Sequence, residues 1–400
     1  MLRKILTALA VLVLLLVGAV IGINLWSEKY LERQAKAAPE PRVAKGEGHF
    51  QKRRFYTNIG LGNISQILVG WPADKEGAAL TVVGNEGAHF LDLTGQLRKE
   101  IHFSKSLFCP IEVARMDAAG DYAYLTRDES WFSSATLLDK DGRVRWTYGG
   151  GAQSFHLLSA VDDSVAGDIY GDGTLSVVIG LNGGGRLVLV NREGKTVWKK
   201  KEGNVWHVET LDTNGDGREE ILHRNAPGQL LVRNANGDVI AEYLPGHYVA
   251  DFTLTRWAEE QRPTHILVPT PEGPEGSSKS VFVVLDASGK TVAQLESPLG
   301  DLLNGIKATP ISCGKGTEYF AVLQNHSASK RSMLLLYDKD GQIVYQEILG
   351  ESCRGIAALP EKGAEQLLVG CAGKIWEYSP ELQTQQRSER RAPKLSSSKR

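Results

Sequence analysis

Short runs of alternating apolar and polar residues recur along the middle of the chain, each interrupted by a turn that contains glycine. Six runs share this form: HFLDLTGQLRKEI (89–101), TLLDKDGRVRW (136–146), LVLVNREGKTVW (187–198), LLVRNANGDVIAEY (230–243), FVVLDASGKTVAQL (282–295) and LLLYDKDGQIVYQE (334–347). A hydrophobic period of two is typical of a half-buried strand, and Asp, Asn and Gly favour a tight turn between two strands. Each run therefore predicts a β-hairpin.

The spacing of these hairpins indicates a repeat architecture. Successive turn glycines lie 43 to 52 residues apart, at Gly95, Gly142, Gly194, Gly237, Gly289 and Gly341. A second pair of short strands precedes several hairpins, as in 112–127, 206–224 and 355–370. Units of about 40–50 residues with four strands each are characteristic of propeller blades. The sequence predicts an all-β fold in which residues 49–382 form a seven-bladed β-propeller, with two separate β-domains as the alternative.

The seventh unit is incomplete when it is read in chain order. KIWEYSPEL (374–382) supplies one strand and a turn, but no convincing strand follows Leu382. HFQKRRFY (49–56), just before the first unit, has the pattern of a strand. We expect this N-terminal strand to complete the last blade and close the ring.

An apolar segment stands apart from the repeats near the N-terminus. Residues 5–27 are 23 consecutive uncharged positions, and 14 of the first 21 are Leu, Ile or Val. A helix of about 20 apolar residues spans a bilayer core, so the segment predicts a single transmembrane helix. Because Arg3 and Lys4 precede it, the positive-inside rule places residues 1–4 in the cytoplasm and the propeller outside.

A cleaved signal peptide is the alternative for this segment. Ala35-Lys36-Ala37 has the A-x-A form of a cleavage site, but it lies well beyond the apolar run instead of closely after it. We therefore favour an uncleaved anchor in a bacterial inner membrane, with the propeller in the periplasm. Residues 28–48 are charged and lack strand periodicity, which predicts a stalk, and the basic stretch 383–400 predicts a disordered tail.

Composition and motifs narrow the function. The 46 Lys and Arg nearly balance the 47 Asp and Glu, whereas a nucleic-acid-binding domain would need a basic excess to neutralise phosphates. No G-x-S-x-G, H-E-x-x-H, Walker or Rossmann pattern occurs. We place the Asp162-Asp163 pair in a turn, with no evident apolar pocket to raise a pKa. These observations predict neither an enzyme nor a nucleic-acid partner.

The strongest local motif is DTNGDGREE (212–220). Side-chain oxygens at alternate positions can converge on a hard cation, with one backbone carbonyl completing the set. The candidate ligands are Asp212, Asn214, Asp216, Glu220 and the backbone carbonyl of Arg218. His223 stands where an EF-hand has its bidentate Glu, and both flanks have the pattern of strands. The motif predicts a structural Ca²⁺ loop within a β-hairpin, and an ordinary polar turn without metal is the alternative.

Two segments resemble a known family. VAGDIYGDGTLSVVIG (165–180) and VETLDTNGDGREEIL (208–222) are similar to the FG-GAP/VCBS-type repeats of integrin-α-like propellers. In that family the loop between the first two strands of a blade binds calcium. The resemblance implies a weak second site in the first segment, where Asp168 and Asp172 match but Tyr170 and Ser176 replace expected ligands. The hairpins with DGRVRW and EGKTVW are more similar to the repeats of quinoprotein-type propellers.

Two of the four cysteines face each other in a predicted hairpin. The numbers of Cys353 and Cys371 have the same sum as those of Leu359 and Glu365 near the turn, so this register places the cysteines directly opposite each other. Opposite residues lie within disulfide range, and an oxidising compartment favours the bond. We predict this disulfide, with a pair of buried thiols or a slipped register as the alternative. The pairing of Cys109 and Cys313 stays open.

Three histidines fall near the start of first strands in successive units, namely His156, His207 and His247. First strands line the centre of a propeller, so these imidazoles could converge there on a metal ion. Ordinary loop histidines are the simpler interpretation.

Together these features predict a membrane-anchored, extracytoplasmic propeller that binds or scaffolds an envelope protein. The candidate contact loops are the long inserts Arg127–Ser134, Pro271–Ser280 and Asn325–Ser332. Two alternatives stay open. A quinoprotein-like or polysaccharide-acting enzyme would bind its ligand at the centre of the ring, which in a quinoprotein would be lined by Arg, Lys and Trp. A glycan-binding adhesin would present solvent-facing aromatic rings on one face.

Overall fold

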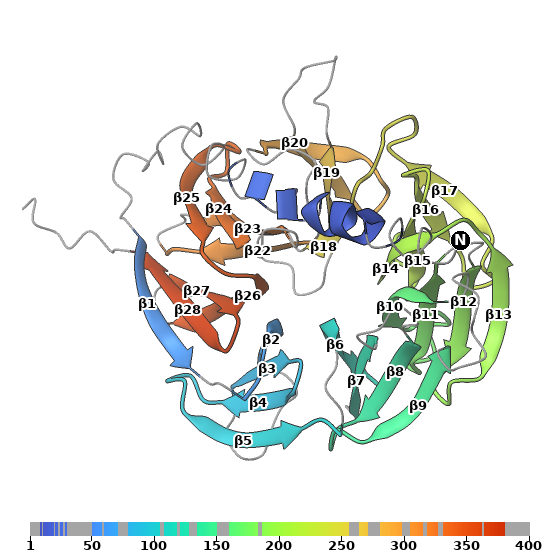
Figure 1. The fold of residues 1–400 in the computed structure, drawn as a ribbon, viewed down its shortest axis with the longest axis horizontal. Coiled ribbons are helices and arrows are strands. Elements are labelled where there is room, and N and C mark those ends of the chain that lie inside the picture. The colour runs from blue at the N-terminus through green and yellow to red at the C-terminus, as the bar shows by residue number, and fades with distance from the viewer. Residues whose placement is uncertain are drawn as a thin grey trace, which may run out of the picture.

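The computed structural model is a ring of seven four-stranded antiparallel sheets, the blades, around a central axis (Figure 1). The residues that the structure describes are 9, 11–19, 21–22, 25–26, 29, 50–57, 60–70, 79–104, 108–117, 121–127, 134–149, 160–182, 186–255, 264–270, 281–297, 305–314, 318–326, 331–361 and 364–380. This ring confirms the predicted all-β, seven-bladed β-propeller.

Blades are numbered here in chain order, and the strands of each blade are given from the axis to the rim. Blade 1 contains β2 (Ile64–Val69), β3 (Leu80–Gly84), β4 (Gly87–Leu91) and β5 (Leu97–His102); blade 2 contains β6 (Phe108–Arg115), β7 (Tyr122–Arg127), β8 (Ser134–Asp139) and β9 (Val144–Gly149). Blade 3 contains β10 (Val161–Gly167), β11 (Ser176–Leu181), β12 (Arg186–Asn191) and β13 (Thr196–Lys201); blade 4 contains β14 (Val205–Leu211), β15 (Glu220–Asn225), β16 (Leu230–Arg233) and β17 (Val239–Tyr243).

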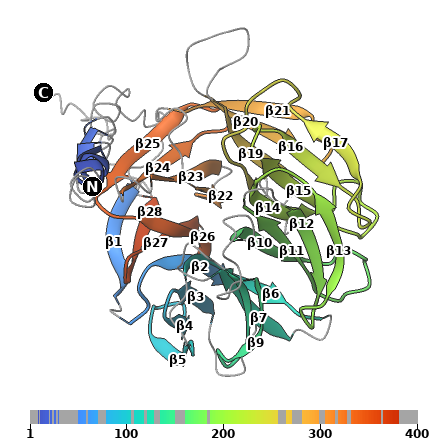
Figure 2. The same cartoon turned by 45° about the vertical axis from the view of Figure 1, so that its right-hand side comes forward.

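The remaining blades follow the same scheme. Blade 5 contains β18 (Thr253–Thr255), β19 (His265–Thr270), β20 (Val281–Asp286) and β21 (Thr291–Glu296); blade 6 contains β22 (Ile306–Ser312), β23 (Glu318–His326), β24 (Arg331–Tyr337) and β25 (Ile343–Leu349). Blade 7 contains β26 (Cys353–Glu361), β27 (Ala364–Cys371), β28 (Lys374–Pro380) and β1 (Phe50–Thr57). Figure 2 shows the first strands, such as β10, β14 and β26, near the axis and the fourth strands, such as β13, β17 and β25, at the rim.

The N-terminal strand closes the ring. β1 pairs antiparallel with β28, from Phe50 opposite Pro380 to Thr57 opposite Lys374. Figure 1 shows β1 in blue beside the red strands of blade 7, so the two ends of the propeller share one sheet. This closure is the one predicted from residues 49–56.

Burial explains the hydrophobic pattern of the strands. The second and third strands of a blade are packed on both faces, and every residue of β11 and β15 is buried. The fourth strands β9 and β13 face solvent and have four exposed and two half-buried residues each, whereas β25 has no exposed residue. Seven hydrophobic clusters fill the spaces between neighbouring blades, as where Phe282 of blade 5 and Phe320 of blade 6 join one cluster. Apolar burial between adjacent blades therefore holds the ring together.

The hairpins between third and fourth strands share one turn. In blade 3, Asn191 Oδ1 accepts hydrogen bonds from the backbone N–H groups of Glu193 and Lys195, and Gly194 N–H donates to the Asn191 carbonyl. Gly194 has φ +77, a left-handed conformation that favours glycine. The Asx residue and the glycine that the sequence repeats are thus the two residues that the turn geometry requires.

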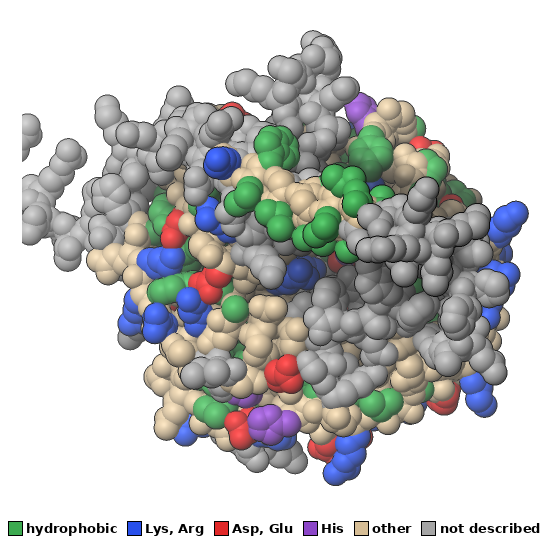
Figure 3. Space-filling view, viewed as in Figure 1, with side chains coloured by type: hydrophobic (Ala, Val, Ile, Leu, Met, Phe, Trp, Pro, Cys, Tyr) green, Lys and Arg blue, Asp and Glu red, His purple; other side chains and the backbone are tan. Residues whose placement is uncertain are grey.

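Helical residues occur at the N-terminus, with 11–19 as the longest run. Their apolar side chains are exposed, with Leu14 at 71%, and Figure 3 shows hydrophobic side chains in green gathered over this helix. Within the described residues, no helix combines the length and the apolar character needed to cross a membrane. The anchor at 5–27 stays a prediction. The stalk at 28–48, apart from residue 29, and the tail at 383–400 lie outside the described residues.

Candidate functional site

The up-and-down strand order sorts every connection onto one of two faces. Connections from first to second and from third to fourth strands lie on one side, which we call the turn face. Connections from second to third strands, and from each blade to the next, lie on the other side, which we call the loop face. The three long inserts all join second to third strands, between β7 and β8, β19 and β20, and β23 and β24. Their flanking strand ends therefore meet the loop face, although the inserts lie largely outside the described residues.

Charged side chains from several blades meet near the axis, and we call this group the axial cluster. Its members are Glu112 of β6, Asp163 of β10, His207 and Glu209 of β14, Asp251 just before β18, and Lys307 of β22. His207 Nδ1 lies 2.6 Å from Asp163 Oδ2, and its Nε2 lies 3.6 Å from Glu209 Oε1. Lys307 Nζ lies 3.9 Å from the same Glu209 oxygen. The placement of Asp163 in a turn was wrong, because this residue lies within a first strand.

The crowding of these groups shifts their pKa values in different directions. Burial and the Glu209 charge raise the pKa of Glu112 to about 8. Burial alone would lower the pKa of His207, but the carboxylates of Asp163, Glu209 and Asp251 together outweigh it and hold this pKa well above its ordinary value. Burial would raise the pKa of Glu209, but the nearby His207 imidazole and the charge of Lys307 lower it. Burial raises the pKa of Asp251 against the opposing charge of His207. The cluster therefore holds protons near neutral pH on Glu112 and His207.

Part of this polar lining connects neighbouring blades. Gln66 Oε1 of blade 1 accepts the Val113 N–H of blade 2 at 2.8 Å. Asp163 Oδ2 of blade 3 accepts the Val208 N–H of blade 4 at 3.1 Å. Because each bond joins the first strands of adjacent blades, the lining has a structural role that does not require a ligand. The described members of the cluster are four carboxylates, one imidazole and one lysine ammonium.

An exposed aromatic pair lies on the loop face of blade 4. Trp206 is the extra residue of a β-bulge, since Val205 pairs with Asn225 and His207 pairs with Arg224. The Arg224 guanidinium lies 4.9 Å from the Trp206 ring and 5.5 Å from the ring of Tyr248, which precedes β18. Trp206 is 53% exposed and Tyr248 50% exposed, whereas Arg224 is buried between them. The sequence reasoning assigned 206–224 to strands but did not anticipate this stack, which depends on the bulge.

The predicted cation loop lies on the turn face, between β14 and β15. Asp212 accepts hydrogen bonds from the N–H groups of Gly215 and Gly217, and Asn214 and Asp216 accept from the backbone two residues further on. Glu220 Oε2 accepts from the N–H and the hydroxyl of Thr213. The candidate ligand atoms are all oxygens of the kind that Ca²⁺ prefers. In this structure their side-chain oxygens accept hydrogen bonds from the N–H groups of the loop. The calcium site at this loop stays a prediction.

The weaker loop lies beside the first one. Asp168 Oδ1 and Oδ2 accept hydrogen bonds from the N–H groups of Asp172 and Gly173. The Asp168 N–H donates to Glu219 Oε2 at 3.1 Å, and the Glu219 N–H donates to the Asp168 carbonyl at 3.1 Å. The structure thus brings the two loops into contact across the interface of blades 3 and 4. The second calcium site at Asp168 and Asp172 stays a prediction.

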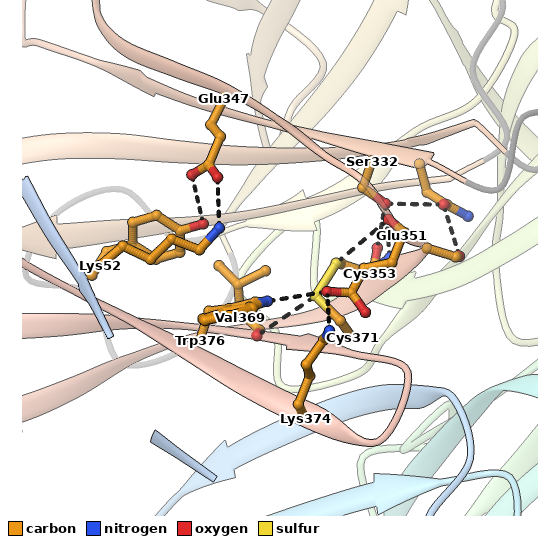
Figure 4. Close-up of a disulfide and its surroundings, with 12 residues drawn as sticks. Lys52, Ser332, Glu347, Glu351, Cys353, Val369, Cys371, Lys374 and Trp376 are labelled. Carbon is orange, nitrogen blue, oxygen red and sulfur yellow. Dashed lines mark hydrogen bonds and ion pairs between the residues drawn. A yellow bond between two sulfur atoms is a disulfide. The ribbon is translucent and has the colours of Figure 1, made fainter. Parts of the chain in front are cut away.

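Cys353 and Cys371 form a disulfide in blade 7, with a Cα–Cα distance of 3.9 Å (Figure 4). The predicted register was wrong within the hairpin, because Leu359 lies opposite Gln366 instead of Glu365. A bulge between Cys353 and Gly355 shifts the register by one residue and returns the two cysteines to opposite positions. In the described residues, three potential metal ligands lie within 4.8 Å of one another only where Glu351 meets these two sulfurs, and the sulfurs are bonded to each other.

The other cysteines and histidines are dispersed. Cys313 is buried after β22, and Cys109 lies in β6 of a different blade, with its side chain outside the described set. His207 belongs to the axial cluster, whereas His247 is exposed on the loop face and His156 lies outside the described residues. The two histidines that the structure describes, His207 and His247, therefore do not come together to form the hypothesised metal site.

Comparison with solved structures supports the fold. The chain is similar to BBS1N in its complex with ARL6DN, with a TM-score of 0.53 and 11% identity over 84% of this chain and 98% of that chain. It is also similar to the Pan2 WD40 domain of Neurospora crassa, with a TM-score of 0.48 and 8% identity over 84% and 97% of the two chains. BamB from Moraxella catarrhalis has a TM-score of 0.42 and 14% identity over 83% and 99%.

At these identities the likeness shows the fold alone. No protein-family model matches the sequence, and no curated protein is similar to it. The resemblance to FG-GAP/VCBS repeats is accordingly not confirmed. The chain is a seven-bladed β-propeller.

Proposed function

We propose that this chain is a membrane-anchored, extracytoplasmic propeller that binds an envelope protein through its loop face. The observation that carries the proposal is that two kinds of recognition feature, exposed aromatic rings and the strand ends beside the long inserts, lie together on the loop face. The exposed rings of Trp206 and Tyr248 and the strand ends that flank all three long inserts share the loop face. Loops on a rigid scaffold are the usual place for recognition, and large exposed aromatic side chains commonly anchor protein interfaces.

The chain enters the propeller from the opposite side. β1 begins at Phe50, opposite Pro380 at the turn-face end of β28, and runs toward the loop face. A tether that precedes Phe50 therefore joins the propeller at the turn face and leaves the loop face available. The apolar side chains exposed on the N-terminal helix support an anchor, because lipid would cover them. BBS1N, which was solved in complex with ARL6DN, is a propeller with a protein partner, which supports the same kind of role.

Affinity purification of the full chain from detergent-solubilised membranes tests this function. We expect envelope proteins that co-purify with the wild type to be lost from a Trp206→Ala/Tyr248→Ala variant. Tyr170→Ala is the matched control, because Tyr170 is an exposed aromatic residue on the turn face. Equal recovery from all three proteins would contradict a loop-face function.

Alkaline carbonate extraction tests the anchor separately. The full chain should stay in the membrane pellet, and deletion of residues 5–27 should release the propeller into the supernatant. Release of the intact full chain would contradict the anchor.

A further inference from the structure

The stack of Trp206, Arg224 and Tyr248, which we call the aromatic clamp, is held in place by the fold. Arg224 Nε donates to the Val249 carbonyl at 2.9 Å, and Nη2 donates to the Tyr248 hydroxyl at 2.7 Å. Tyr248 also packs on Gly228, where an added Cβ would lie 2.3 Å from the ring. These contacts hold the Tyr248 ring and the Arg224 guanidinium in place before any partner binds, and the guanidinium in turn faces the Trp206 ring. Each ring exposes about half of its surface to water. Such preorganisation reduces the entropic cost of binding.

The composition of the clamp indicates a protein interface. Trp, Tyr and Arg are the residues most enriched at sites that dominate the binding energy between proteins. The guanidinium donates only through Nε and Nη2 to the described residues, so Nη1 retains donors for an incoming group. A carboxylate is the acceptor that a guanidinium binds most strongly.

Exposed basic side chains at the loop-face end of blade 3 favour an acidic partner. Arg186 and Lys201 are exposed and lie directly opposite each other at the loop-face ends of β12 and β13, in the blade that precedes the clamp, and Lys199 is exposed on the same strand as Lys201. Like charges in opposite positions destabilise a sheet, and neither Arg186 nor Lys201 has an ion-pair partner among the described residues. The acid that follows them, Glu202, is already paired with the buried Arg233.

We propose that a partner protein docks on the aromatic clamp through an acidic segment. An apolar side chain of that segment covers Trp206 and Tyr248, and a neighbouring carboxylate reaches Arg224. Arg186 and Lys201 attract the segment over a longer range, so its binding weakens as salt increases. This inference rests on the proposed function, because it assigns the kind of partner that the loop face binds.

Selection from a displayed library of random short peptides, against the full-length protein in detergent, tests this proposal. We expect the enriched peptides to place Asp or Glu beside an aromatic or aliphatic residue. Trp206→Ala should weaken their binding at least tenfold, Trp206→Phe should weaken it less, and the turn-face variant Tyr170→Ala should leave it unchanged. Lys201→Glu should weaken binding and reduce its salt dependence, whereas Lys195→Glu, at an exposed turn-face position, should do neither.

The outcomes separate this inference from the proposed function. Enriched peptides that need Trp206 but are neutral or basic would overturn the acidic partner and leave a loop-face function standing. If every peptide enriched on the wild type also binds the Trp206→Ala variant, or if no peptide is enriched, both the acidic partner and the loop-face function would be overturned. If a sulfated oligosaccharide bound the clamp more tightly than the enriched peptides, with the same dependence on Trp206, the partner would be an anionic glycan and the proposal would be wrong.

Discussion

Trp198 of blade 3 donates its indole N–H to the carbonyl of Ala235 in blade 4, at 2.8 Å. Ala235 follows the Asx residue of the next hairpin turn. The same contact recurs one blade earlier, where Trp146 donates to Arg192, and one blade later, where Tyr243 donates to Ala287. An aromatic residue on each of these fourth strands therefore binds the turn of the following blade. This explains why the repeated hairpins so often end in an aromatic residue.

The turn glycines permit this contact, which leads to a test with a matched control. An added Cβ at Gly289 would lie 2.3 Å from the Tyr243 ring, whereas one at Gly246 would meet nothing within 4 Å. Both glycines have similar positive φ angles, +85 and +81, so alanine carries a similar backbone cost at either position of about 1 kcal/mol. Gly289→Ala should cost roughly 1–3 kcal/mol more than Gly246→Ala in thermal or denaturant unfolding. Equal losses would show that the contact between blades contributes nothing.

The disulfide should stabilise the blade that closes the ring. Cys353 and Cys371 are 18 residues apart, and a loop of that length predicts a stabilisation of about 3 kcal/mol. We expect a reductant to lower the melting temperature of the wild type and to leave that of a Cys353→Ala/Cys371→Ala variant unchanged. Two reactive thiols at these positions in the full chain purified from membranes without reductant would contradict the prediction.

The axial cluster predicts that stability falls as pH rises. The pKa of Glu112 increases from 4.5 to about 8 on folding, so the folded protein binds an additional proton between these values. The free energy of unfolding should therefore decrease across this window by up to about 1.4 kcal/mol per pH unit. His207, whose pKa is also raised, adds a decrease in the free energy of unfolding at pH values above 6.5, the ordinary pKa of a histidine.

Glu112→Gln isolates the first of these contributions. The variant keeps a similar shape but cannot lose a proton, so it should be more stable than the wild type at pH 8. Melting temperatures measured from pH 5 to pH 8 should show a shallower decline in the variant. Parallel curves for the two proteins would exclude a half-buried, protonated Glu112.

Calcium should stabilise the turn face if the loop at 212–220 binds it. A ligand at 100 times its Kd contributes about 2.7 kcal/mol, so EGTA should lower the melting temperature of the wild type by several degrees. Asp216→Ala should abolish this response, and Asp172→Ala should reduce it only if the weaker loop also binds. A melting temperature that EGTA leaves unchanged in both the wild type and Asp216→Ala would remove the calcium proposal.

The blades could be predicted from the sequence because their signals are local. Alternation marks each strand, and an Asx residue followed three positions later by glycine marks each turn between third and fourth strands. Closure was predictable because 374–382 lacked a final strand and 49–56 supplied one. The register of β26 and β27 was not predictable, because the bulge between Cys353 and Gly355 moves the pairing by one residue and no local sequence pattern marks it.

The axial cluster depends on contacts that no local pattern contains. Asp163 and His207 are 44 residues apart, and only the ring brings their side chains within 2.6 Å. The alternating polar residues His207 and Glu209 in a predicted first strand were the available signal, because first strands line the axis. The aromatic clamp likewise joins residues from β14, β15 and the connection to β18, so it becomes visible only after the strands are assembled.

Site-specific photocrosslinking in intact cells tests the loop face most directly. A photoreactive amino acid would replace Tyr248 on the loop face or Tyr170 on the turn face of the full-length, membrane-bound chain. We predict a discrete adduct with one envelope protein from position 248, lost when Trp206 is also changed to Ala, and no such adduct from position 170. An adduct from position 170 alone, or equal adducts from both positions, would contradict recognition through the loop face.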